Sequence, residues 1–549
     1  MSIEIGKTRI GDVVEENAKK LGNNVALAYY EYDFRKTFSE FDEICNQVAK
    51  GLMALGIKRG DHVAMWANNL PEWVYTQFGS AKMGAVMVTV NTNFRAFELE
   101  YLLGQSDAST LILTGGVRTP DEYLKVLEQV LPELANCEPG NFKSDTLPNL
   151  KNVVYLGKEK IPGVYNWQDV MEMGKSVSGD DFQKRKDSLE SDDVIMMQYT
   201  SGTTGYPKGV MLTHSNLLGN AYSMAETMGL TPEDAMCIPV PFFHCFGCVI
   251  GTMVCTVSGT AMVPITSFDP KKVMEAVQKY KCTALLGVPT MFIAELEEMT
   301  KNKYDTTPLR TGVMAGSTCP VEVMKGVMDK MGAMEMTIVY GQTEASPGIT
   351  QTRRDDPMDV RTETVGRALP NVEVKIVDPI TDETLGPGEP GELCSRGYHI
   401  MKGYYNMPEK TEEVIDSDGW LHTGDLATVD EQGNYRIVGR LKDMIIRGGE
   451  NIYPREIEEF LYTHPAVRDV QVVGIPSRKY GEKVAAFIQL RPDAENVMED
   501  DIKSFCKDKI SFHKIPQYCF FVQEFPATAS GKIQKYKLRE FAVQEVGEE

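Results

Sequence analysis

Short apolar runs that alternate with helical stretches constrain the fold of this chain more than any other feature of the sequence. The apolar runs have the length of buried strands and recur at residues 62–67, 84–90, 109–113, 235–239, 259–264 and 284–288. Between them, residues 97–105 and 271–279 place apolar side chains at i, i+3 and i+4, as an amphipathic helix does. Because strands separated by helices usually pair in parallel, the sequence predicts an α/β fold with a large N-terminal body of layered, parallel-type sheets and helices.

The pattern changes near residue 370. The chain of 549 residues is long enough for three to four units of roughly 150 residues each. From about 370 to 439, short strands are separated by turn-forming residues, which indicates a β-rich subdomain. Residues 444–549 have the pattern of a small, mobile α+β domain. We therefore predict an N-terminal domain over residues 1–439, a hinge at 440–443 and a C-terminal domain over 444–549.

Charge and cysteine usage narrow the class of protein. The 57 Lys and Arg residues against 78 Asp and Glu give a net charge of −21, which opposes binding to nucleic acid or to an anionic membrane surface. The 11 cysteines are scattered and odd in number, so we expect a reduced, cytoplasmic setting. The N-terminal residues lack the apolar core of a signal peptide. The most apolar window, 246–265, is broken by Gly and Pro, and we interpret it as a buried sheet segment rather than a transmembrane segment.

Residues 200–209, TSGTTGYPKG, follow an apolar run and concentrate hydroxyls, glycines and one lysine. Glycines let backbone N–H groups approach phosphate oxygens, hydroxyls donate further hydrogen bonds, and lysine adds positive charge. Lys208 is not followed by Ser or Thr, so this is not a Walker A loop. The segment indicates a phosphate-binding loop, and composition alone leaves a flexible surface loop as the alternative.

Three further segments carry polar side chains at the ends of expected strands. Residues 340–344, YGQTE, offer a carboxylate that would need a cation such as Mg²⁺ beside a triphosphate, although a plain strand-end turn fits too. Asp425 in WLHTGD can accept from two ribose hydroxyls while Arg440 adds donors, although Asp after Gly is common in β-turns. In residues 440–454, charged residues precede Gly-Gly, which suits either a mobile junction or an ordinary turn.

Two more residues stand out by their surroundings. Lys532, in PATASGKIQK near the end of the chain, would by itself be interpreted as a solvated surface residue. His244 lies among aromatics in PFFHCFG, where a hydrogen-bonded core histidine is the alternative to a functional role. Cys245 and Cys248 form a single C-x-x-C without a second ligand pair, which favours burial over metal binding.

In their order and residue content these motifs resemble those of the adenylate-forming superfamily of acyl-CoA synthetases, luciferases and peptide-synthetase adenylation domains. The resemblance covers roughly residues 10–540, and PFFHCFG, GVPTMF, RGYHIMKGYY, LKDMIIRGGENIYP and KISFHKIP make medium-chain acyl-CoA ligases the most similar branch. It implies an AMP-forming acyl-CoA synthetase that joins a carboxylic acid to coenzyme A at the expense of ATP, with Mg²⁺, through an acyl-adenylate.

The resemblance also implies roles for individual residues. ATP would be bound by Thr200, Ser201, Gly202, Thr203, Thr204, Gly205, Lys208, Gly316, Ser317, Thr318, Tyr340, Thr343, Asp425 and Arg440. Thr200 and Glu344 would hold the metal; Lys442 would be the hinge, and Gly448 and Gly449 would line the CoA channel. Phe243, His244 and Gly316 would line the acyl pocket, and the catalytic residues would be Lys532, Glu344 and His244.

Several alternatives stay open at this level. The acyl group is expected to be a medium-length chain, with cyclic or aromatic carboxylates as the next choice, and the reaction could run in reverse to make ATP. Rival classes are a stand-alone amino-acid adenylation domain, a luciferase-like oxygenase and a non-catalytic nucleotide-sensing scaffold. The partners expected are the small-molecule carboxylate, ATP and CoA, and a homodimer is open.

Overall fold

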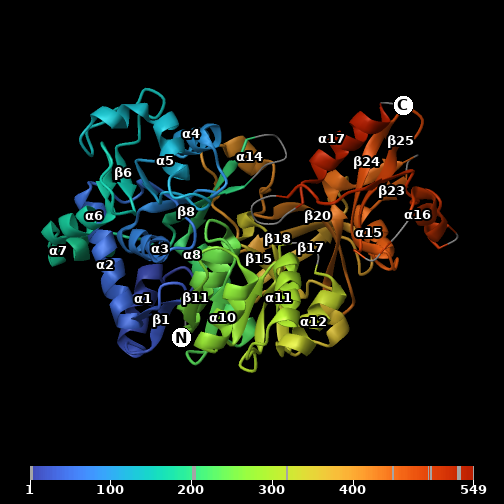
Figure 1. Ribbon diagram of the computed structural model, residues 1–549, viewed down its shortest axis with the longest axis horizontal. Coiled ribbons are helices and arrows are strands. Elements are labelled where there is room, and N and C mark those ends of the chain that lie inside the picture. Colours follow the sequence, from blue (N-terminus) through green and yellow to red (C-terminus); the bar gives the residue numbers. More distant parts are fainter. Residues whose placement is uncertain are drawn as a thin grey trace. The chain divides into compact units, whose positions relative to one another are not determined.

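The computed structural model describes residues 4–200, 206–316, 319–447, 450–492, 494, 497–507, 509–527 and 533–547, without the side chains of residues 450 and 451. Contacts divide the chain into two compact units (Figure 1). The first unit comprises Met1–Glu373 and Ser395–Leu421, and the second comprises Val374–Cys394 and His422–Glu549.

Two large sheets form the first unit. The described part of the larger one has nine strands in the order β16 (Arg367–Ala368), β15 (Gly348–Gln351), β14 (Glu335–Gly341), β13 (Thr311–Met314), β12 (Ala284–Gly287), β10 (Ala235–Ile238), β11 (Ala261–Pro264), β1 (Val25–Tyr29) and β2 (Phe34–Thr37). Its interior strands, from β14 to β1, pair in parallel, and the strands beyond them are antiparallel. The parallel interior confirms the predicted sheet type.

The second sheet of this unit has eight strands among the described residues, in the order β19 (Gly403–Tyr404), β9 (Lys208–Thr213), β8 (Val194–Thr200), β4 (Val86–Thr89), β3 (His62–Trp66), β5 (Thr110–Leu113), β6 (Asn152–Tyr155) and β7 (Tyr165–Asn166). The strands from β8 to β7 are parallel, whereas β8 and β9 form an antiparallel hairpin. Strands β6 and β7 extend this sheet beyond β5.

Helices cover and separate these sheets. Those of the first unit are α1 (Ile10–Lys20), α2 (Phe38–Ala54), α3 (Pro71–Met83), α4 (Ala96–Gln105), α5 (Glu122–Val130), α6 (Trp167–Met173), α7 (Gly179–Asp187), α8 (His214–Met228), α9 (Val254–Ser258), α10 (Pro270–Tyr280), α11 (Pro289–Lys301), α12 (Val321–Met331), α13 (Met358–Glu363) and α14 (Pro408–Glu412), with short turns η1 (Pro132–Asn136), η2 (Gly174–Ser176), η3 (Phe246–Met253) and η4 (Thr343–Ala345). Helices α10, α11 and α12 stand side by side (Figure 1), and their apolar faces pack on the nine-stranded sheet. Helix α3 is buried from Trp73 to Met83, so it lies inside the unit.

Residues 246–258 are helical, which corrects the prediction of a buried sheet segment at 246–265. A π-helical turn, η3, continues into α9, and only β11 at the end of this window is a strand. Every residue of η3 is buried. A segment that is buried on all sides shows no apolar–polar alternation, so periodicity cannot distinguish helix from strand there.

The second unit contains two smaller sheets among its described residues. The four-stranded sheet has the order β17 (Val372–Val377), β18 (Gly391–Gly397), β20 (Leu421–Val429) and β21 (Tyr435–Arg440). The other sheet has the order β23 (Glu450–Ile452), β22 (Ile445–Arg447), β25 (Gly481–Leu490) and β24 (Val467–Ser477), with β26 (Tyr518–Phe521) also paired to β25. Helices α15 (Pro454–Tyr462), α16 (Glu499–Cys506) and α17 (Lys535–Val546) pack on it, and η5 (Leu441–Asp443) joins the two sheets.

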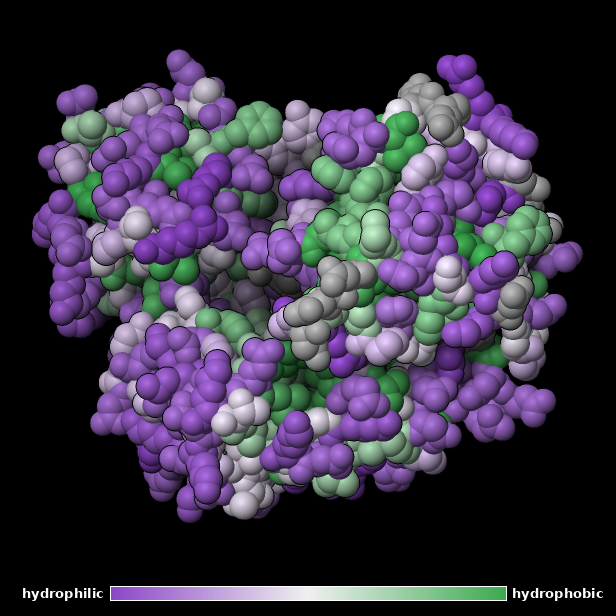
Figure 2. Space-filling view, turned by 45° about the vertical axis from the view of Figure 1, so that its right-hand side comes forward, coloured by the Kyte–Doolittle hydropathy of each residue, from purple (hydrophilic) through white to green (hydrophobic). Residues whose placement is uncertain are grey.

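The contacts group two parts of the β-rich segment, Val374–Cys394 and the residues from His422 onward, with the C-terminal residues, so the predicted hinge at 440–443 lies inside the second unit. The hinge concerns motion and stays a prediction. In the described part of the chain, no helix is both long and apolar enough to cross a membrane. Hydrophilic side chains cover most of the face shown in Figure 2, while the large aliphatic and aromatic side chains fill the cores.

Two buried histidines of the first unit make its stability depend on pH. Burial lowers the pKa of both His214 and His399 from 6.5 to about 4. Between these pH values the unfolded chain binds protons that the folded chain does not. We therefore expect the free energy of unfolding to fall as the pH is lowered from 6.5 toward 4, by about 1.4 kcal/mol per pH unit for each ring.

Urea unfolding at pH 7 and pH 5 measures this dependence. His214→Gln removes one of the two groups, so the midpoint of this variant should change less between the two pH values. An equal change in the variant and the parent protein would contradict the assignment.

Candidate active site

The phosphate-loop prediction falls on the hairpin between β8 and β9. Thr200 is the last residue of β8 and pairs directly with Lys208, the first residue of β9. Directly opposed residues of an antiparallel pair project from the same face, so the hairpin brings the predicted hydroxyl and ammonium together. Residues Ser201, Gly202, Thr203, Thr204 and Gly205 lie outside the described residues.

Lys208, Tyr404 and Glu344 form a connected group in the first unit. The Lys208 Nζ atom lies 4.0 Å from the centroid of the Tyr404 ring, a cation–π distance. The Tyr404 hydroxyl donates a 2.8 Å hydrogen bond to Oε1 of Glu344. Burial lowers the pKa of Lys208, and the negative charge of Glu344 acts in the opposite direction. The predicted phosphate-binding lysine and the predicted metal ligand therefore share one buried tyrosine.

Sequence reasoning did not assign Tyr404 a role. No local pattern shows that β19 pairs with β9, where Tyr404 is opposite Val210. This pairing across almost two hundred residues places the ring over Lys208. Only the tertiary structure reveals the contact.

The 340–344 segment is shaped by a tight turn. Tyr340 and Gly341 end β14, and Glu344 lies on η4. At Gly341 a Cβ atom would lie 1.8 Å from the carbonyl oxygen of Pro347, so this position requires glycine. Thr343 is buried, whereas Tyr340 and Glu344 are half-buried. The turn thus presents Glu344 at the end of a parallel strand, where α/β sheets commonly bind ligands.

The predicted acyl-pocket residues lie against this turn. Cys245 Sγ is 3.8 Å from Thr343 Oγ1, which brings the PFFHCFG and YGQTE segments into contact. Nδ1 of His244 accepts a 3.1 Å hydrogen bond from the Phe246 N–H, which orients the ring. Phe243 is half-buried beside it.

Gly316 follows β13 with a φ of +89°, a conformation that favours glycine. A Cβ atom there would meet a side-chain methyl of Val288 at 3.1 Å, so a larger residue would be strained and crowded. The neighbouring predicted residues Ser317 and Thr318 lie outside the described residues.

The predicted ribose pair belongs to the second unit. Asp425 of β20 and Arg440 of β21 are directly paired, and Arg440 Nε lies 3.1 Å from Asp425 Oδ1. Asp425 is 6% exposed. Lys442 lies on η5, just after this pair, and its pKa is lowered by burial and by the charge of Arg440. The predicted residues Gly448, Gly449 and Lys532 lie outside the described residues.

In each unit, taken by itself, the residues present fit a part of the predicted ligand. Glu344 offers a half-buried carboxylate with a hard oxygen, the ligand type that Mg²⁺ prefers, and Lys208 nearby supplies positive charge for phosphate. In the second unit, the buried carboxylate of Asp425 can accept from vicinal hydroxyls.

Comparison with known proteins covers nearly the whole chain. The family described as AMP-binding enzyme matches residues 14–405, and the AMP-binding enzyme C-terminal domain matches residues 456–532. A protein of Bacillus subtilis (strain 168) named "Putative acyl-CoA synthetase YngI" is 55% identical over 541 residues, which is 98% of each chain. Human mitochondrial medium-chain acyl-CoA ligase ACSF2 is 40% identical over 539 residues, which is 97% of this chain and 87% of that protein.

The fold is also similar to solved structures. The crystal structure of the anthranilate CoA ligase AuaEII in complex with anthranoyl-AMP has a TM-score of 0.84 and 27% identity, and 98% of each chain is covered. The α/β fold with a small C-terminal domain is therefore shared along the full length of that protein.

Proposed function

The chain belongs to the family of AMP-binding enzymes and is an acid–thiol ligase of the acyl-CoA synthetase type, and on this premise we propose that its acyl substrates are medium-chain fatty acids. The observation that carries the proposal is the 40% identity to a medium-chain acyl-CoA ligase over 97% of this chain. The reaction is carboxylic acid, ATP and CoA to acyl-CoA, AMP and diphosphate.

In the first half-reaction the carboxylate oxygen attacks the α-phosphorus of ATP, and diphosphate leaves. Lys208 and the phosphate loop would hold the phosphate oxygens, while Glu344 and Thr200 would hold Mg²⁺. When bound, the ion would supply positive charge that offsets the charge of the phosphates, which is mostly what catalysis of such a transfer requires. We place His244 beside the substrate carboxylate, and the hydrogen bond from the Phe246 N–H that orients its ring supports this role.

In the second half-reaction the CoA thiol attacks the acyl carbon of the adenylate, and AMP leaves. Asp425 and Arg440 bind the ribose through both steps, and their pairing on neighbouring strands supports this role. We assign the exchange between the two steps to a rotation at Lys442, after which Gly448 and Gly449 line the CoA channel. We propose that this hinge separates an N-terminal domain over residues 1–439 from a C-terminal domain over residues 444–549.

A panel of acids tests the acyl preference. CoA-dependent AMP formation would be measured with Mg²⁺ and straight-chain acids from acetate to palmitate, benzoate and alicyclic acids. We expect kcat/KM for middle-length chains to exceed that for acetate by about a hundredfold, because each buried methylene contributes transition-state binding. Reactions without CoA, followed by ATP–diphosphate exchange, control for the first half-reaction.

A maximum at ring acids would contradict the medium-chain proposal and support the second candidate. That candidate is favoured by the structural similarity to an anthranilate CoA ligase. Formation of ATP from acyl-CoA, AMP and diphosphate would show the reverse direction. Nucleotide binding without ATP–diphosphate exchange for any acid would favour a nucleotide-sensing scaffold.

We also propose a cytoplasmic location. Light scattering would test whether the protein forms a homodimer.

A further inference from the structure

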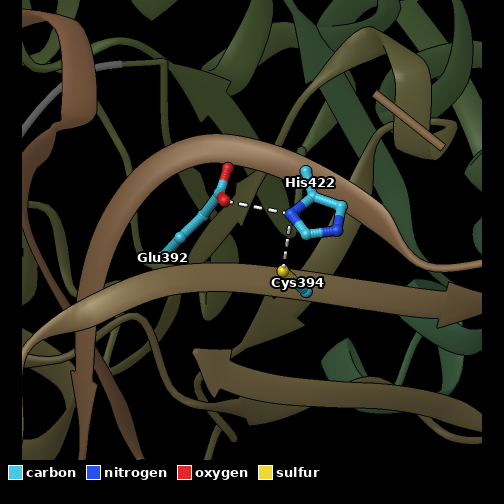
Figure 3. Close-up of side chains that lie close together, drawn as sticks. All are labelled: Glu392, Cys394 and His422. Atoms are coloured by element: carbon cyan, nitrogen blue, oxygen red, sulfur yellow. Dashed lines mark hydrogen bonds and ion pairs between the residues drawn. The ribbon is translucent and has the colours of Figure 1, made fainter. Parts of the chain in front are cut away.

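Three side chains of the second unit meet between the neighbouring strands β18 and β20 (Figure 3). His422 Nδ1 lies 3.0 Å from Glu392 Oε2 and 3.4 Å from Cys394 Sγ. The second carboxylate oxygen of Glu392, Oε1, accepts a 2.8 Å hydrogen bond from the Gly424 N–H. Glu392 is only 8% exposed. One buried carboxylate on β18 therefore holds both a ring and a backbone donor of β20.

The segment held in this way leads directly to Asp425. The Thr423 hydroxyl donates a 2.7 Å hydrogen bond to the Leu393 carbonyl and accepts one of 3.1 Å from the Asp425 N–H. Each of the three residues before Asp425 is thus fastened to β18: His422 and Gly424 through Glu392, and Thr423 through Leu393. Gly424 has a φ of +69°, so the backbone turns sharply where the carboxylate fastens it.

We propose that Glu392 is a positioning residue for the ribose-binding carboxylate: by clasping His422 and the Gly424 N–H, it fixes where Asp425 meets the nucleotide. The proposal rests on the role of Asp425 in the proposed function. Hydrogen bonds to a buried carboxylate are about twice as strong as neutral ones, so the clasp holds its donors firmly. A preorganised acceptor gains affinity because less orientational freedom is lost when the ribose binds.

Glutamate, cysteine and histidine are also the side chains that bind zinc. The geometry favours the clasp, because His422 Nδ1 must carry a proton to donate to Glu392, and a protonated nitrogen has no lone pair for a metal. Both oxygens of Glu392 already accept hydrogen bonds. Elemental analysis of the purified protein separates the two: one tightly held zinc ion per chain, lost in Glu392→Gln, would overturn the proposal.

The experiment compares kcat/KM for ATP with that for 2′-deoxy-ATP and 3′-deoxy-ATP in the full-length enzyme. Asp425→Ala should abolish the preference for ATP. In Glu392→Gln the amide keeps one acceptor and turns its NH₂ toward the other donor, so we expect the preference to fall about tenfold. The loss should lie in the KM for ATP more than in kcat, because Glu392 does not touch the reacting atoms.

Glu373→Gln is the matched control. Glu373, on β17 of the same sheet, accepts hydrogen bonds of 2.8 and 3.0 Å from the Arg396 guanidinium. The Glu373→Gln variant therefore also loses a paired carboxylate, but its preference for ATP over the deoxy-ATPs should equal that of the parent protein. His422 supplies a second test if Glu392→Gln does not fold. His422→Asn can retain the N–H donor and should keep most of the preference for ATP, whereas His422→Ala should lose that preference.

The failures are distinguishable. Unchanged ribose preference in Asp425→Ala would refute the ribose role and the inference with it. Lost preference in Asp425→Ala together with parental preference in a folded Glu392→Gln would overturn the inference alone. If only the His422 pair can be measured, equal preference in the Asn and Ala variants would overturn it.

Discussion

Replacing Lys532 by alanine is expected to reduce the adenylation rate by about a hundredfold to a thousandfold, while the reaction of supplied acyl-AMP with CoA changes little. In the proposed mechanism the positive charge of this lysine bridges the substrate carboxylate and the α-phosphate. We therefore expect it to stabilise the transition state of the first half-reaction and to be dispensable in the second. The assignment rests on the sequence, because Lys532 lies outside the described residues.

ATP–diphosphate exchange measures the first half-reaction, and single turnover of synthetic acyl-AMP with CoA measures the second. Lys537→Ala is the matched control, since it removes a nearby lysine on the exposed side of α17, next to the Tyr536 ring. Equal losses in both half-reactions would show that Lys532 acts in both or supports the fold, and would refute the assignment.

Replacing Glu344 by glutamine is expected to lower kcat/KM by about a hundredfold and to raise the Mg²⁺ concentration needed for half-maximal rate. The amide keeps the size of the side chain but removes the negative charge that binds the ion. It also removes the charge that opposes the lowering of the Lys208 pKa, so that pKa should fall further. A series of initial rates against Mg²⁺ at saturating ATP measures the effect.

Tyr404→Phe separates charge from orientation at the same site. The substitution deletes the hydroxyl that donates to Glu344 but leaves the carboxylate and the ring beneath the Lys208 ammonium. We therefore expect the Mg²⁺ concentration needed for half-maximal rate to rise about tenfold. Glu322→Gln, an exposed carboxylate paired with Lys325 on α12, is the control. A Glu344→Gln enzyme with the parental Mg²⁺ dependence would contradict the metal role.

Local patterns predicted the elements that follow a regular period. The helices at 97–105 and 271–279 appear as α4 and α10, and the apolar runs at 62–67 and 284–288 appear as β3 and β12. The two helices have one face in a core, so their burial repeats with the period of the backbone, whereas the two strands are short apolar runs that are buried on both faces.

Two other segments were predicted less well. Residues 246–258 are buried on all sides and form helix, although their composition indicated a strand. Strands β6 and β7 lie in a polar stretch that gave no alternating pattern. The motif residues could be proposed from the sequence because their chemistry is local, as for the hydroxyls and lysine at 200–208, and their roles stay predictions.

By itself, the sequence determined the α/β class, the order of the motifs and the chemical types gathered in each of them. Only the tertiary structure decided which motifs touch: Tyr404 meets Glu344 and Lys208, Cys245 meets Thr343, and Glu392 clasps the residues before Asp425. The physical reason is that periodicity and turn chemistry depend on neighbours within a few residues. Contacts between distant segments depend on which strands pair and in what register, and that is decided by packing of the whole unit.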